Sequence, residues 1–114
     1  MSAWLSLCLK YHQLCGAPDE RFIPRRLLYL GLVENSARSV GDGITIRLTE
    51  SSRHFSRAAP YAGLSYCWWK DLEGVITTTK VNLDAFYVGI LSTTLSQAVQ
   101  DAILVCQKLG IQYL

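Results

Sequence analysis

The sequence predicts an α/β fold, in which an incomplete parallel or mixed sheet with flanking helices is preceded by a helix and a β-hairpin. Three observations predict it. Apolar and polar residues alternate over 44–49, as in a half-buried strand. Apolar residues recur at helical spacing over 95–109, and Gly110 ends that run. The apolar segment 111–114 follows immediately, which predicts a strand that returns to the sheet.

Composition limits the classes of partner and compartment. The 114 residues carry a net charge of +2, too small to indicate nucleic acid or an anionic membrane as a partner. No apolar run approaches the roughly 20 residues of a membrane span. The four cysteines have no compact disulfide spacing. We therefore expect a cytoplasmic protein with reduced thiols, and no cofactor is predicted.

The first part of the chain, 1–60, predicts a helix and then a hairpin. Apolar residues from Trp4 to Cys15 share one helical face, and a Gly and a Pro follow them. Segments 26–30 and 44–49 are predicted to pair across a loop of about a dozen residues. The polar and basic stretch 51–60 is predicted to be a linker.

The second part, 61–114, predicts a β-α-β unit. Segment 61–67 is predicted to be a strand, and 111–114 to run parallel to it after a right-handed crossover through helix 95–109. Thr93 or Thr94 is expected to cap that helix. A shorter helix over 80–87 is expected to be capped by Thr78 or Thr79 and broken by Gly89.

Three segments of the second part match one known domain in order and spacing. They are YAGLSYCW at 61–68, TTKVNL at 78–83 and LSQAVQDAILVCQKLGIQYL at 95–114. Together they resemble the fungal heterokaryon incompatibility (HET) domain, and 1–60 resembles the segment that often precedes it. The signature residues that the resemblance singles out are Leu64, Ser65, Tyr66, Cys67, Trp68, Thr79, Asn82, Leu83, Asp101, Ala102, Leu109, Gly110 and Tyr113.

The resemblance implies a fold that is TIR-like in outline and a role in fungal non-self recognition and programmed cell death. It also implies protein partners, including self-association, and offers NAD as a substrate by analogy with TIR domains. Trp69 stands where the family has Gly, and the family continues past 113–114 into a Trp-Ile-Asp segment. We therefore expect a truncated or degenerate domain, with a TIR-like NAD-cleaving enzyme and a non-catalytic interaction module as alternatives.

Candidate chemistry in the second part has competing interpretations. Cys67 beside Ser65 is either a nucleophile or, as we favour, a buried small hydrophobe in a polar-laced inner strand. Asp101 is either a buried acid with hydrogen-bonding partners or a solvent-facing residue. Asp71 and Glu73 are loop carboxylates that could stabilise a positively charged ribosyl transition state.

A candidate metal site lies in the first predicted helix. Cys8, His12 and Cys15 fall at i, i+4 and i+7, which places three soft ligands on one helical face. A structural zinc site takes four ligands, and no fourth is nearby in the sequence. We therefore favour the interpretation that this face packs against the hairpin, with metal binding as the alternative.

Overall fold

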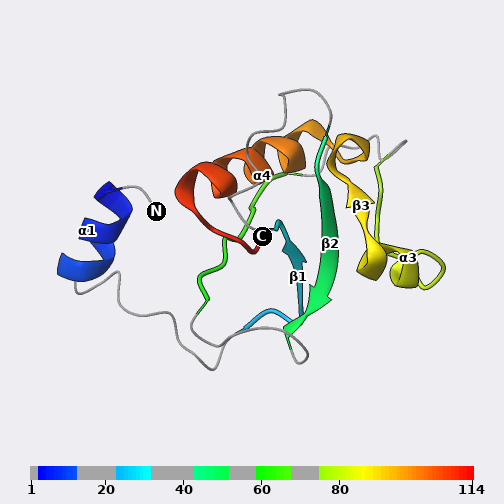
Figure 1. Cartoon of the computed structure of the whole chain (residues 1–114), viewed down its shortest axis with the longest axis horizontal. Helices are drawn as coiled ribbons and strands as arrows, with labels where there is room; N and C mark the ends of the chain where they lie inside the picture. The colour runs from blue at the N-terminus through cyan, green and yellow to red at the C-terminus, as the bar shows by residue number, and fades with distance from the viewer. Residues whose placement is uncertain (1–2, 13–22, 32–42, 52–58, 68–74) are drawn as a thin grey trace.

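The protein has a small α/β fold built on a three-stranded antiparallel sheet (Figure 1). A computed structural model describes residues 3–12, 23–31, 43–51, 59–67 and 75–114. The strands are β1 (Arg26–Tyr29), β2 (Thr45–Glu50) and β3 (Ile90–Leu91), in the order β1-β2-β3. The predicted hairpin is confirmed as the antiparallel β1–β2 pair, while β3 was not predicted.

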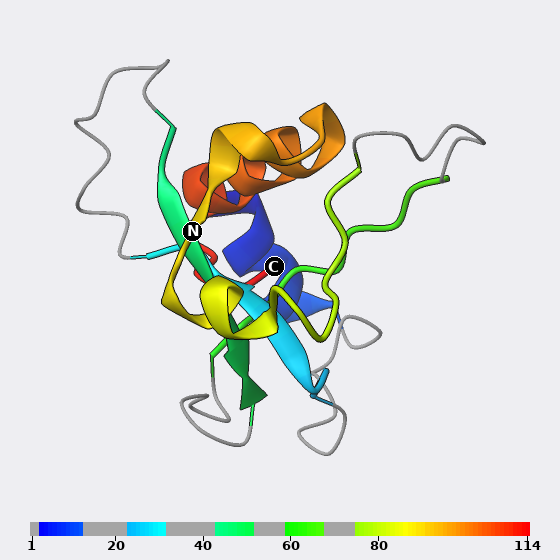
Figure 2. The same cartoon turned by 90° about the vertical axis from the view of Figure 1, so that its right-hand side faces the viewer.

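Four helices lie in the described residues alongside these strands. They are α1 (Ala3–Tyr11), α3 (Leu83–Val88), the 3-10 helix η3 (Ser92–Thr94) and α4 (Gln97–Leu109). Figures 1 and 2 show α4 lying across one face of the sheet. The two predicted helices of the second part are confirmed, each beginning two or three residues later than expected.

The predicted cap of α4 is wrong, whereas Thr79 makes the contact expected of a cap: its hydroxyl accepts from the Asn82 N–H at 3.4 Å, in the turn just before α3. α4 begins after Ser96 and α3 after Asn82, and neither residue makes a side-chain capping hydrogen bond. Thr94 belongs to η3 instead, where its hydroxyl donates to the Leu91 carbonyl oxygen at 2.7 Å. The short η3 turn between β3 and α4 therefore delays the start of the helix.

The core lies between the sheet and α4. Alternation along the strands points Leu30, Ile46 and Ile90 toward the helix, which contributes Ile103 and Cys106. The centre of this core is Ile46, whose exposed fraction is only 1%. Burial of the Cys106 side chain among these residues raises the pKa of its thiol.

The end of α4 is a left-handed turn that returns the chain to the sheet. Gly110 has a φ of 72°, and its N–H donates to the Gln107 carbonyl oxygen at 3.1 Å. The N–H of Ile111 donates to the Cys106 carbonyl oxygen at 2.8 Å, which completes a Schellman motif. The predicted stop at Gly110 is thereby confirmed.

The segment after this turn pairs on both sides. Leu28 and Leu114 exchange backbone hydrogen bonds of 2.8 and 3.0 Å, so the segment runs antiparallel to β1. On its other side Tyr113 forms one parallel bridge, with Tyr61. Where a parallel pair of strands was predicted, the structure therefore holds a single bridge, and its named strands are all antiparallel.

We expect Ile46→Ala to lower the free energy of unfolding by about 2–5 kcal/mol, because it leaves a cavity at the most buried side chain. Urea denaturation measures the change. Val88→Ala is the control, since Val88 is 85% exposed and should shift stability by roughly 0.5 kcal/mol or less. Similar losses in both variants would contradict the location of the core.

We expect Gly110→Ala to cost about 1–2 kcal/mol, because an L-residue with a side chain is strained at a φ of 72°. Gly63→Ala is the matched control, since a methyl group there meets no atom within 4 Å and Gly63 lacks a positive φ. Urea midpoints of the two variants give the comparison. An equally stable Gly110→Ala variant would refute the left-handed turn.

Candidate functional site

The segment 61–67 joins the sheet only at its beginning. The N–H of Ala62 donates to the Tyr113 carbonyl oxygen at 2.9 Å, next to the Tyr61–Tyr113 bridge. Residues 63–67 then lie outside strands and bridges, and all five are exposed. The predicted inner strand over 61–67 is therefore wrong beyond Tyr61.

The same correction applies to Cys67. Its side chain is exposed, so it is not the buried small hydrophobe that we favoured. Ser65 is exposed beside it. A cysteine nucleophile needs a base to take its proton. His54, Trp68 and Trp69 lie outside the described residues.

An open hollow of about 300 Å³ lies beside the start of this segment. Its walls come from Pro24, from 26–28 on β1, from 61–64, from Val99 of α4 and from Leu114. Four predicted elements of the chain thus meet here, because the C-terminal segment pairs with β1 on one side and with 61–62 on the other.

The lining decides what the hollow can bind. Apart from Arg26 and the Tyr61 hydroxyl, its side chains are hydrocarbon, so it offers mainly dispersion contacts and apolar burial. Its volume is at the lower limit of the roughly 300–1,000 Å³ of small-molecule sites. An open hollow of this size has room for one or two apolar side chains.

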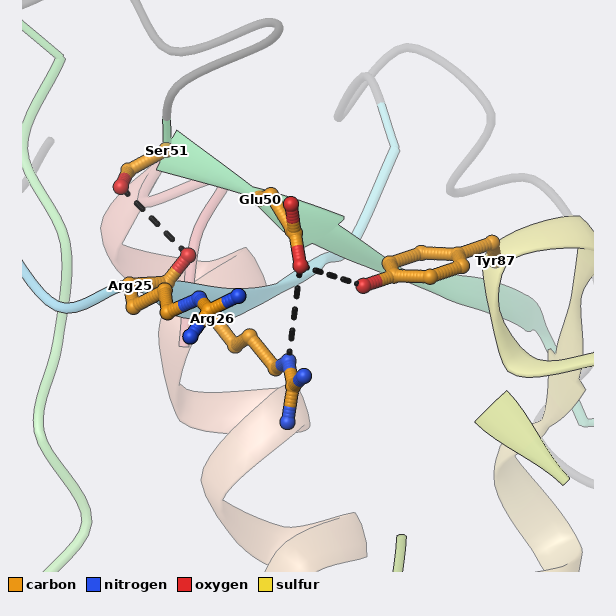
Figure 3. A network of polar contacts seen from close by, with 5 residues as sticks. All are labelled: Arg25, Arg26, Glu50, Ser51 and Tyr87. Carbon is orange, nitrogen blue, oxygen red and sulfur yellow. Dashed lines mark hydrogen bonds and ion pairs between the residues drawn. The ribbon is translucent and has the colours of Figure 1, made fainter. Parts of the chain in front are cut away.

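Arg26 belongs to a polar network that the sequence did not reveal (Figure 3). The Tyr87 hydroxyl of α3 donates to Oε1 of Glu50 at 2.7 Å. The same oxygen lies 3.7 Å from Nε of Arg26, an ion pair that is partly exposed and is worth on the order of 0–1 kcal/mol. The network ties α3 to the end of the β1–β2 hairpin.

The sequence could have predicted the Arg26–Glu50 pair of this network, but not the contact with Tyr87. Arg26 and Glu50 are direct cross-strand partners in the hairpin, a position where opposite charges favour pairing. Tyr87 could not be placed, since its position depends on the unpredicted strand β3. The bond to the Glu50 carboxylate, followed by desolvation, raises the pKa of Tyr87, and Arg26 opposes this effect in part.

The middle signature residues form a local turn. The N–H of Thr79 donates to Oδ1 of Asn82 at 2.7 Å, and the Asn82 N–H donates back to the Thr79 hydroxyl at 3.4 Å. The Asn82 amide also donates to the Thr77 carbonyl oxygen at 2.9 Å. These contacts lead the chain into α3, where Leu83 is the first residue, and give Thr79 and Asn82 a structural role.

The signature residues of α4 divide between surface and fold. Asp101 is exposed and accepts a hydrogen bond of 2.8 Å from Gln97, one turn earlier, so the solvent-facing interpretation holds and the buried acid does not. Ala102 and Leu109 are half-buried, and Leu109 packs against the core. Gly110 and Tyr113 make the turn and the bridge described above.

Two of the three residues of the candidate metal site at the end of α1 are described. Sγ of Cys8 lies 3.4 Å from Nδ1 of His12, while Cys15 is outside the described residues, as are Asp71 and Glu73. Within the part of the chain that the structure describes, no three side chains of metal-ligand type gather. α1 has no buried residue, and only Leu5 of its side chains packs against the core, so the helix face predicted to pack is mostly exposed.

No family model matches the chain, and no curated protein and no solved structure is significantly similar to it. In the described ranges, no helix combines the length and apolarity needed to cross a membrane.

Tyr87 gives stability a pH dependence whose sign follows from its pKa. The folded pKa lies above the unfolded value of about 10, so the neutral phenol is favoured in the fold. The stabilisation that Tyr87 gives the folded state is fully present below a pH of about 10, and it is lost as the pH rises through the folded pKa. We expect the wild type to lose more stability than Tyr87→Phe between about pH 8 and about pH 11.

Urea midpoints at the two pH values measure this difference. Tyr11→Phe is the control, since Tyr11 is 64% exposed, and it should follow the wild type. Glu50→Gln should bring the phenolate absorbance transition of Tyr87 back toward its ordinary pH. An unchanged transition in Glu50→Gln would show that the Tyr87–Glu50 bond is absent in solution.

Proposed function

We propose that the chain is a heterokaryon incompatibility-type signalling protein, and that it acts by binding protein partners. The three sequence segments support the family. One observation supports the mode of action: the first signature segment leaves the sheet after Ala62 and runs exposed beside an open apolar hollow.

The exposed segment has the composition of a contact surface. Leu64 is 40% exposed at the rim of the hollow, and Tyr66, two residues further, is 37% exposed. Tyr is a side chain that interfaces favour, because it combines a large apolar ring with a hydroxyl. Apolar residues around a concave surface, with Arg26 as a charged neighbour, indicate a partner that inserts an apolar side chain.

A TIR-like outline belongs to the same proposal. The parallel bridge between Tyr61 and Tyr113 has the direction that a β-α-β unit requires, so it would be the first rung of a mixed sheet. The partners would be cytoplasmic proteins, a second copy of the chain among them, and neither nucleic acid nor membrane.

NAD cleavage stays a prediction from the family analogy. Such a reaction needs a carboxylate placed to stabilise a positively charged sugar. Of the described carboxylates near the sheet and α4, Glu50 accepts from Tyr87 and Asp101 accepts from Gln97. Release of nicotinamide by the purified protein would establish the activity, and its absence would remove it.

The protein-binding mode is tested by substitutions at matched exposure. We expect Leu64→Asn to abolish the growth arrest caused by expressing the protein in a fungal host, because it places an amide at the rim of the apolar hollow. Ile76→Asn is the control, since Ile76 is also 40% exposed but does not line the hollow. Colony counts and thermal unfolding are measured for both variants.

Two results would count against the proposal. If the wild-type protein caused no arrest, the incompatibility function would fail. If Leu64→Asn arrested growth as strongly as Ile76→Asn, the function could stand, but the hollow would not be its contact surface.

A further inference from the structure

The end of α1 brings a thiol and an imidazole together. Sγ of Cys8 and Nδ1 of His12 are 3.4 Å apart. The backbone fixes this arrangement, since the His12 N–H donates to the Cys8 carbonyl oxygen at 3.0 Å and continues the helical hydrogen-bonding pattern to the end of the helix. His12 is exposed and Cys8 half-buried, so both side chains can be reached from solvent.

This separation is close to the distance between two ligands of one zinc ion. Zn–S bonds of about 2.3 Å and Zn–N bonds of about 2.0–2.1 Å, at a tetrahedral angle, put sulfur and nitrogen about 3.6 Å apart. Residues at i and i+4 on a helix are a known arrangement for two zinc ligands. A bound metal would replace this thiol–imidazole hydrogen bond after the side chains rotate toward it, and the distance between the two atoms would change little.

The charge at a helix C-terminus favours a cation over a bare thiolate. The last carbonyl groups of α1 carry a partial negative charge, which stabilises a bound cation and disfavours an unpaired anion. Lys10 is the basic residue of the last turn. Its Nζ lies 5.2 Å from the centroid of the Tyr11 ring. Residues two apart on a helix do not face each other, so the Lys10 ammonium points away from Cys8.

We propose that Cys8 and His12 chelate a soft divalent cation of the zinc type, with the remaining coordination positions open to water or other ligands. Cys8 binds as the thiolate, and its proton passes to the solvent when the metal binds. Such a site is accessible and exchangeable, unlike a closed structural zinc site. This inference does not depend on the proposed signalling function.

The test is calorimetric titration of the purified protein with Zn²⁺ alone, in a thiol-free reductant. We expect one ion per chain, and on the order of tenfold or greater loss of affinity in both Cys8→Ser and His12→Gln, since even outer-shell changes cost that much. Cys67→Ser is the matched control, because it removes an exposed thiol elsewhere and should leave the affinity unchanged.

Cd²⁺ supplies a second readout that a merely structural contact would not produce. Its thiolate charge-transfer absorbance should appear in the wild type and in Cys67→Ser, and disappear in Cys8→Ser. Circular dichroism checks that the variants remain folded. Absence of zinc binding in the wild type, or binding unchanged in both Cys8→Ser and His12→Gln, would overturn the proposal.

Discussion

The structure depends on the two-sided pairing of the segment that follows α4. Its hydrogen bonds with Leu28 and Leu30 align it with β1, and the Tyr113 carbonyl oxygen holds Ala62 on the other side. This pairing is possible only because Gly110 reverses the chain within one residue. α4 is thereby fixed over the sheet, and Ile103 and Cys106 are brought onto Ile46.

The candidate site arises because the C-terminal segment pairs with only the first two residues of 61–67. One bridge and one hydrogen bond secure Tyr61 and Ala62, and the rest of the segment lies on the surface. β1 pairs with β2 on one edge and with 112–114 on the other, and the hollow lies where 61–64, the start of β1 and Val99 of α4 surround Leu114. Exposed apolar groups remain there because no described element of the chain covers them.

Sequence patterns within a short stretch of chain predicted the elements whose stabilising interactions lie within or next to that stretch. Alternation predicted the β1–β2 hairpin, and helical spacing with a terminal Gly predicted α4 and its stop. They failed for β3, which has only two residues. They also failed for 61–67, whose tyrosines favour a strand but which has no partner strand beyond Ala62 among the described residues. The contact between Tyr87 and Glu50 depends on how α3 docks, which periodicity does not specify.

The signature residues therefore fall into two physical classes, and the division bears on function. Thr79, Asn82, Gly110 and Tyr113 make backbone-directed contacts that any protein with this fold would need. Leu64, Ser65, Tyr66 and Cys67 are exposed, so their side chains add little to the buried core. The first group holds the backbone in place, and the second group lies on the surface beside the hollow, in an irregular segment of the kind that often carries binding residues.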